Sequence, residues 1–343
     1  MTPPPGGAVI SDIAVALPER AVPNAQLMAD LPPATAALLA RRTGVGQRHI
    51  VAAGQTALDL GEQACRDLFA THPELADRID ILVFCTQTPD HPLPPNSCVL
   101  HGRLSLPGRV MAFDVPHACS AFVYALRVVD ALMRAGAGAD ALIVTADAYS
   151  TLINPRDRAT SVLFGDAGAA TWLTRSSDAA RGTAAFDCGT DGGGVASFIV
   201  PAGGARVPVT DEIRSRETTD ASGNVRSDAQ IVMDGQEILT FAGVRVPESI
   251  NAVLDRAGLT LGDVQWFVFH QASAMVLDLL TSCLGLDPAR VVRSLADTGN
   301  TVSASIPIAL RSALDDERIR PGDIVLLCGF GAGLSWGSAV FRW

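Results

Sequence analysis

Cys119 stands where one apolar stretch of the chain gives way to another, which makes it the first residue to consider for chemistry. The run Val-Met-Ala-Phe-Asp-Val at 110–115 predicts a buried strand, and the apolar stretch after Cys119 predicts a helix that begins at once. A helix N-terminus offers unpaired N–H groups and the positive end of the helix dipole, which favour a thiolate and can bind an oxyanion. A structural cysteine that opens a buried helix fits the same pattern equally well.

A thiol that acts as a nucleophile needs a partner that gives or takes a proton. Of the six histidines, His270 is the best placed, because it ends an apolar run at the carboxyl end of a predicted strand, where α/β proteins assemble their sites. His117 lies two residues from Cys119 and could support it, and the other four histidines lie in polar or loop contexts. Asn300 precedes an apolar helix and taken alone is an ordinary turn or capping residue.

The chain around these residues alternates short apolar runs with longer helical stretches, as α/β proteins do. These elements must position the candidate site residues. Strands are predicted at 8–16, 79–86, 109–115, 141–146, 169–173, 184–188, 198–201, 266–270, 324–329 and 338–342. Helices are predicted at 54–69, 119–135, 236–257, 273–284 and 303–314. The two halves repeat this alternation on either side of a polar junction within 174–182. We also expect an irregular proline-rich loop at 89–95 and an exposed insertion at 203–227.

Composition narrows the class of protein. The 343 residues are 48% apolar and 18% charged, which suits two domains with large cores and excludes a mainly disordered chain. The net charge of −10 argues against nucleic acid or an anionic membrane as a main partner. All 26 basic residues are arginine, which excludes a lysine Schiff base and a phosphate-loop lysine. Seven scattered cysteines without a CxxC pair are typical of a reducing compartment, so we expect a cytoplasmic protein with no secretory signal and no membrane helix.

Three other readings of the motifs fail. Gly333-Leu334-Ser335-Trp336-Gly337 matches the hydrolase pattern G-x-S-x-G, but the residues after it predict a strand and include no acid or histidine. The glycine-rich turns never complete G-x-G-x-x-G between a strand and a helix. This argues against the hypothesis of a nicotinamide-dependent Rossmann enzyme. His117 and Cys119 are too few to ligate a metal, and we expect no metal site.

Four motifs, in this order, resemble those of the β-ketoacyl-[acyl carrier protein] synthase III family. They are Asp114-Val115-Pro116-His117-Ala118-Cys119, His270-Gln271-Ala272, Gly299-Asn300-Thr301 and Phe330-Gly331-Ala332-Gly333. The supporting segments Arg42-Thr43-Gly44, Arg48-His49-Ile50, Arg158-Ala159-Thr160 and Phe164-Gly165-Asp166 agree as well. The resemblance therefore covers nearly the whole chain.

This resemblance implies an α/β thiolase fold, in which two similar βαβαβαββ halves form a five-layer αβαβα sandwich. We expect the half with the nucleophilic cysteine to span 1–178 and the half with the histidine and asparagine to span 179–343. The implied catalytic set is Cys119, His270 and Asn300, with the backbone N–H groups of Cys119 and Ala332 as the oxyanion hole. In such enzymes the cysteine takes an acyl group from a thioester. The histidine and asparagine then stabilise the enolate that forms when a malonyl thioester loses CO2.

The same resemblance implies a set of substrate contacts, namely Arg42, Thr43, Leu93, Arg158, Phe164, Gln236 and Ala272. Leu93 falls where a residue of the partner subunit caps the acyl pocket in the family. Three positions depart from the family pattern. Leu38 replaces a tryptophan that stacks on the coenzyme A adenine, Gln236 replaces an asparagine at the pantetheine arm, and Met275 replaces an arginine that docks the carrier protein. These departures favour a member of specialised metabolism.

We expect thioesters of coenzyme A or of an acyl carrier protein as substrates, no bound cofactor, and a homodimer. The leading hypothesis is decarboxylative condensation at acyl-Cys119. The alternative is a cysteine-dependent acyltransferase that moves the acyl group to an oxygen or nitrogen acceptor without decarboxylation. Asn300 favours condensation, because plain acyl transfer needs no pair of donors for an enolate. The complete catalytic set disfavours a third reading, a non-catalytic subunit that only completes the pocket of a homologue.

Overall fold

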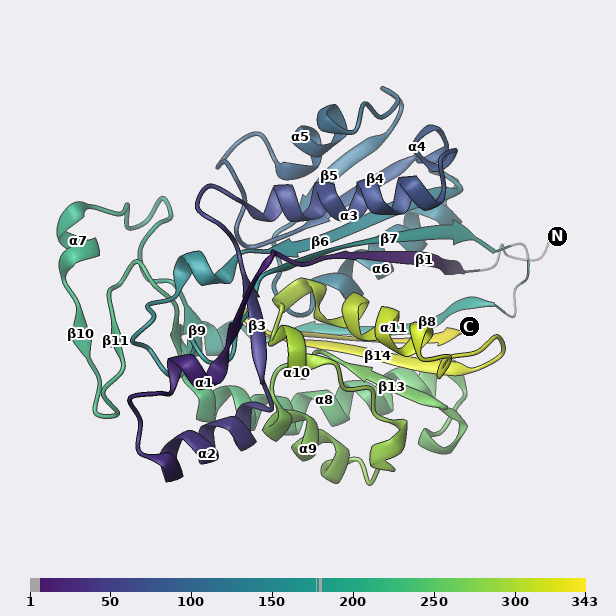
Figure 1. Ribbon diagram of the computed structural model, residues 1–343. Coiled ribbons are helices and arrows are strands. Elements are labelled where there is room, and N and C mark those ends of the chain that lie inside the picture. Colours follow the sequence, from purple (N-terminus) through teal and green to yellow (C-terminus); the bar gives the residue numbers. More distant parts are fainter. Residues whose placement is uncertain (1–6, 177, 179–180) are drawn as a thin grey trace.

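The computed structural model describes residues 7–176, 178 and 181–343, and its first half is built on one five-stranded sheet (Figure 1). The strands of this sheet are β1 (Ala8–Ala16), β4 (Ile81–Cys85), β5 (Met111–Val115), β6 (Asp140–Asp147) and β7 (Ala167–Arg175). Their order is β1-β7-β6-β4-β5, in which β6, β4 and β5 are parallel and β7 is antiparallel to both of its neighbours. Strands β4 and β6 are buried along their whole length, as their continuous apolar sequence predicts.

The second half repeats this arrangement. Its sheet holds β8 (Gly182–Thr190), β13 (Trp266–Phe269), β14 (Ile324–Gly331) and β15 (Ser335–Arg342), in the order β13-β14-β15-β8. As in the first sheet, the initial strand pairs antiparallel with the final strand, which pairs antiparallel with the strand before it. A single parallel bridge between Phe267 and Val291 stands where the first sheet has its edge strand β5.

Helices fill three layers around the two sheets (Figure 1). Helix α3 (Ala57–Thr71) packs on the outer face of the first sheet, and α8 (Gly235–Ala257) and α9 (Ala274–Cys283) pack on the outer face of the second. Between the sheets lie α6 (Ala121–Arg134) and α11 (Ser305–Asp315), whose buried side chains contact both. The result is the five-layer αβαβα sandwich that was expected for a thiolase fold.

The remaining elements are short and lie mostly in the connections. The helices are α1 (Asn24–Leu27), α2 (Pro33–Thr43), α4 (Leu75–Arg78), α5 (Asn96–Arg103), α7 (Asp211–Ser215) and α10 (Leu295–Thr298). The strands are β2 (Arg20–Pro23), β3 (Gln47–Ile50), β9 (Phe198–Ile199), β10 (Thr218–Thr219), β11 (Val225–Arg226) and β12 (Val232–Met233). Single 3₁₀ turns span Tyr149–Leu152, Gly192–Ser197, Leu261–Asp263, Pro288–Arg290 and Val302–Ala304.

Several predicted boundaries move for identifiable reasons. Helix α3 begins at Ala57 rather than at 54, because Thr56 and Asp59 form a capping box that fixes its first turn. The insertion at 203–227 is largely exposed, as predicted, but it contains α7 and the β10–β11 pair. Ser335 begins β15, which agrees with the rejection of the hydrolase elbow. The predicted boundary between residues 178 and 179 lies beside residues 177, 179 and 180, which are outside the described residues.

Candidate active site

Cys119 lies in the turn between β5 and α6 and is only 3% exposed. Strand β14 of the other half passes directly against it. A Cβ atom placed on Gly331 would lie 3.0 Å from the Cys119 sulfur, and one placed on Gly329 would lie 2.5 Å from the Cys119 carbonyl oxygen. Both positions therefore require glycine if the sulfur and its peptide are to stay where they are.

His270 follows the last residue of β13, and hydrogen bonds fix its ring. Its backbone N–H donates to the carbonyl of Cys328 at 2.8 Å, and its Nδ1 lies 2.6 Å from the Ser305 hydroxyl at the start of α11. The ring also packs edge-on against Phe330, with the ring centroids 5.5 Å apart. Burial lowers the pKa of His270 to about 3, so the imidazole is neutral at physiological pH.

Asn300 is held by the backbone of both halves. Its N–H donates to the Leu163 carbonyl at 2.9 Å, and its carbonyl accepts from the Gly165 N–H at 3.0 Å. The side-chain Oδ1 accepts from the Val302 N–H at 3.0 Å, and Nδ2 donates to the Ala272 carbonyl at 3.4 Å. Because Oδ1 is engaged by the backbone, the group that Asn300 can offer a ligand is its remaining Nδ2–H.

One cavity of about 200 Å³ brings the expected catalytic residues together. Cys119, His270 and Asn300 all line it, although they come from three separate segments of the chain. Four of the expected substrate contacts line it as well, namely Arg42, Thr43, Phe164 and Ala272. The cavity therefore exposes a thiol, a neutral imidazole and a carboxamide to one common space.

The other expected contacts lie elsewhere. Leu93 is 81% exposed on the proline-rich loop, and Gln236 is exposed in the first turn of α8. Arg158 does not line the cavity, and its guanidinium makes two 3.0 Å bonds to the carboxylate of Asp30. Ala332 lines a neighbouring cavity instead. Among the described residues, the N–H groups of Cys119 and Ala332 have no hydrogen-bond acceptor other than the cysteine's own sulfur, so both remain free for an oxyanion.

The pKa of Cys119 is shifted in the opposite direction to the one expected from the sequence. The helix N-terminus was expected to favour a thiolate, but burial raises the pKa of Cys119, and the nearby Asp147 carboxylate adds to this rise. Helix α6 begins only at Ala121, so its first free N–H groups lie beyond the cysteine. The resting thiol therefore keeps its proton at neutral pH.

Ser305 and Asp147 lie next to the site and were not identified from the sequence. Asp147 ends β6, is fully buried, and accepts hydrogen bonds from the backbone and hydroxyl of Ser303 at 3.2 and 2.5 Å. It also accepts from the Gln87 N–H at 2.8 Å. Burial raises its pKa to about 7. The available signal was weak, since a serine or an aspartate at the end of a strand or the start of a helix is common for structural reasons.

Replacing Asp147 with asparagine is expected to speed the alkylation of Cys119 by iodoacetamide about tenfold at pH 8, which corresponds to a fall of about one unit in the cysteine pKa. At that pH the carboxylate is ionised, and its charge raises the pKa of Cys119. Below pH 6 Asp147 is protonated, so the two rates should converge. The measurement is peptide mass spectrometry of the Cys119 peptide between pH 5 and 9. Asp166→Asn, at a second buried carboxylate, is the matched control.

Replacing Ser305 with alanine is expected to slow the condensation step that the family resemblance implies about fivefold, and to leave acylation of Cys119 unchanged. The lost bond to His270 Nδ1 holds the ring in place, and such a bond contributes roughly 1 kcal/mol. Single-turnover acylation and steady-state product formation measure the two steps separately. Ser312→Ala on the same helix is the control, and an equal loss in both steps would show that Ser305 acts only through the fold.

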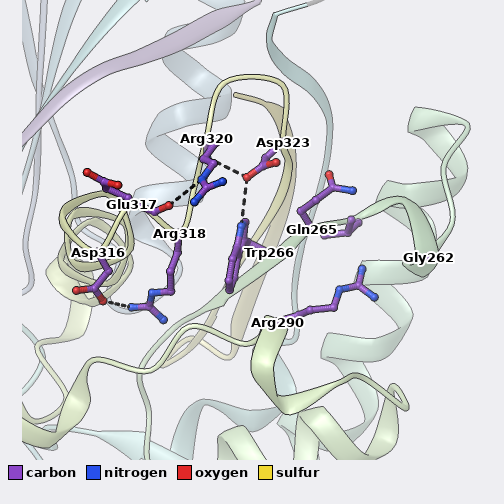
Figure 2. A pocket seen from close by; sticks show the side chains of 10 residues that line it. Gly262, Gln265, Trp266, Arg290, Asp316, Glu317, Arg318, Arg320 and Asp323 are labelled. Atoms are coloured by element: carbon purple, nitrogen blue, oxygen red, sulfur yellow. Dashed lines mark hydrogen bonds and ion pairs between the residues drawn. The ribbon is translucent and has the colours of Figure 1, made fainter.

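A larger surface hollow, of about 630 Å³, contains none of these residues (Figure 2). The dashed lines in Figure 2 mark hydrogen bonds among its lining residues, including one from the Arg320 side chain to the Glu317 backbone carbonyl at 3.2 Å. Arg318 pairs with Asp316 at 2.8 Å, and Asp323 accepts from the Trp266 indole at 3.2 Å. Neither a thiol nor a histidine lines this hollow, and we assign it no chemistry.

Within 7–176, 178 and 181–343, no three side chains of histidine, cysteine, aspartate or glutamate come close enough together to hold a metal ion. No helix in the same part of the chain is both long and apolar enough to cross a membrane.

Comparison with known proteins gives a consistent set of relatives. Residues 113–192 match the family model described as 3-oxoacyl-[acyl-carrier-protein] synthase III, and residues 254–343 match the model of its C-terminal part. The chain is 37% identical to β-ketoacyl-[acyl-carrier-protein] synthase III 5 of Streptomyces coelicolor, over 98% of both chains. It is 36% identical to the β-ketoacyl-[acyl-carrier-protein] synthase III of Acidiphilium cryptum, over 97% of this chain and 98% of the relative.

Solved structures agree with these matches. A crystal structure of a 3-oxoacyl-(acyl-carrier-protein) synthase III superposes with a TM-score of 0.95 at 36% identity, covering 98% of this chain and 100% of the other. The priming β-ketosynthase of the R1128 polyketide biosynthetic pathway superposes with a TM-score of 0.84 at 28% identity, covering 99% and 97% of the two chains.

Proposed function

Because the chain belongs to the β-ketoacyl-[acyl-carrier-protein] synthase III family, we propose that it joins an acyl thioester to a malonyl-type thioester by decarboxylative condensation. The observation that carries this proposal is the single cavity lined by Cys119, His270 and Asn300. Its thiol can hold an acyl group while the two side-chain donors face a second thioester. The substrates are thioesters of coenzyme A or of an acyl carrier protein, and the proposed reaction needs no bound cofactor.

The first step is acylation of Cys119. The sulfur attacks the thioester carbonyl, the new carbon–sulfur bond forms, and the pantetheine thiolate leaves with the proton that the cysteine gives up. The free N–H groups of Cys119 and Ala332 stabilise the tetrahedral oxyanion. Since burial raises the pKa of Cys119, the proton must leave as the bond forms rather than before it.

The second step is loss of CO2 from the malonyl group. The thioester carbonyl oxygen takes up the charge of the enolate, and it accepts hydrogen bonds from His270 Nε2–H and Asn300 Nδ2–H. Both donors are neutral, so they stabilise the developing charge without binding the ground-state carboxylate tightly. The enolate carbon then attacks the acyl carbonyl, and the thiolate of Cys119 departs and takes a proton from water.

Product analysis tests this function against simple acyl transfer. The protein is incubated with a panel of acyl thioesters, with and without malonyl thioester. The masses of the protein and of the products are then measured by mass spectrometry. We expect an acyl adduct on Cys119, release of CO2, and a product longer by a β-keto unit. If Cys119 is acylated but no CO2 is released, and the product is an ester or amide, the reaction is acyl transfer and not condensation.

We propose that two copies of the chain pair along β5. This strand is an edge of the first sheet, and its first residue, Met111, is 41% exposed. An edge strand with exposed apolar side chains is typical of an association surface. Leu93 is exposed and lies three residues before Asn96, whose N–H donates to Asp114 of β5 at 2.8 Å, so this pairing would bring the partner close to Leu93. Light scattering of the purified protein is expected to give the mass of two chains, and the mass of one chain would contradict the pairing.

A further inference from the structure

A second cavity, of about 520 Å³, adjoins the proposed site. Phe198 lines both cavities, and Pro116 and Ala332, which flank the cysteine in space, line the second. The first cavity is lined by Arg42 and Thr43, which the family resemblance assigns to substrate contact, and we place the pantetheine arm there. An acyl group held on the sulfur, with its carbonyl at the Ala332 N–H, would therefore extend into the second cavity.

The wall of this second cavity is mostly apolar, and its polar side chains are Thr86, Gln87 and Tyr149. Thr86 is buried and donates to the Asp147 carboxylate at 3.3 Å, which leaves Gln87 and Tyr149 as a polar pair. The Tyr149 hydroxyl donates to Gln87 Oε1 at 2.5 Å, and both residues line the cavity. Tyr149 is 2% exposed, and its ring packs on Phe164 with the centroids 5.4 Å apart. Cys119 belongs to the same packed cluster as Tyr149. The pair therefore lies close to the sulfur and within the space that an acyl chain would fill.

The pair keeps one donor free for a ligand, because Gln87 is exposed at the cavity and its Nε2 is open to solvent. Gln87 uses its oxygen to accept from Tyr149, and within the described part of the chain its Nε2 donates to no other group. Burial raises the pKa of Tyr149, which keeps its hydroxyl neutral. A plain alkyl chain would remove water from these polar atoms and offer nothing in return, which costs free energy. An oxygen on the acyl chain would take the place of water as the acceptor of the Gln87 Nε2–H bond.

On the basis of the proposed function, we propose that Gln87 and Tyr149 select acyl groups that carry a hydrogen-bonding oxygen over alkyl groups of equal length. Hydroxyacyl and oxoacyl thioesters are the chemical class that fits. A site built to bond an oxygen discriminates strongly against the analogue that lacks it, whereas an apolar wall discriminates only weakly between chains that differ by one group.

The experiment compares matched pairs of thioesters on the intact protein. Hexanoyl-N-acetylcysteamine and its 3-, 4- and 5-hydroxy and 5-oxo derivatives are the probes, and the readout is the second-order rate of Cys119 acylation by intact-protein mass spectrometry. The wild-type protein is expected to react at least about tenfold faster with one oxygenated probe than with hexanoyl. Gln87→Leu should abolish that preference, and Tyr149→Phe should reduce it about threefold.

The outcomes separate this inference from the function on which it rests. Equal rates for all probes, or an unchanged ratio in both variants, would overturn the selection while leaving acylation of Cys119 established. Variants that lose thermal stability but keep the wild-type ratio would show that the pair only satisfies a buried tyrosine. Absence of any adduct with every probe would overturn the proposed function and this inference together.

Discussion

Replacing Cys119 with alanine is expected to eliminate the acyl adduct and to lower β-keto product formation by at least about 10⁴-fold. The loss is this large because the proposed reaction passes through a bond to the cysteine sulfur, and catalytic groups that act as a unit typically cost about 10⁴-fold or more when the nucleophile is removed. Intact-protein mass spectrometry and product quantification measure the two quantities on the same sample.

Cys98→Ala is the matched control, because Cys98 is an exposed thiol on α5 that does not line the cavity. This variant should form the adduct at the wild-type rate. The alanine side chain at position 119 is smaller and apolar, so the fold should persist, and an unchanged melting temperature would show it. An acyl adduct that survives in Cys119→Ala would place the nucleophile elsewhere and end the proposed mechanism.

The sequence was most informative where residue type and local context agree. Strand β1 was predicted to its last residue, because its apolar run is bounded by polar and proline-containing segments. The motifs around Cys119, His270 and Asn300 were found from spacing together with family resemblance, and the structure places these residues around one cavity. Short helices such as α2 were missed, because an eleven-residue segment that is mostly exposed has little apolar periodicity to detect.

Contacts between segments that are distant in the chain could not be predicted from the sequence. Arg158, which we expect to contact substrate, also pairs with Asp30, which lies 128 positions away in the chain. Ser305 reaches the ring of His270, and Asp147 reaches Ser303, only because α11 and its preceding turn pack between the two sheets. Likewise, the rise in the pKa of Cys119 follows from its burial between two halves, which a local pattern cannot report.

Replacing Asn300 with aspartate is expected to lower the condensation rate about 10³-fold while acylation of Cys119 proceeds nearly as in the wild type. Aspartate keeps the shape of the side chain, and one of its oxygens can still accept from the Val302 N–H. The other oxygen replaces the Nδ2 donor and puts negative charge where the enolate oxygen develops its own. Loss of a donor to such an oxyanion costs about 10² to 10³ in rate, and the added repulsion increases that cost.

Asn300→Ala makes the comparison decisive, because it removes the donor without adding charge. If an enolate forms, the aspartate variant must be slower in condensation than the alanine variant, although aspartate keeps the bond from the Val302 N–H that alanine loses. If the protein only transfers acyl groups, no charge develops beside residue 300, and the order should follow stability alone, with aspartate the more active. The ranking of these two variants, measured as product formed per acylated enzyme, therefore reports whether a carbanion exists on the reaction path.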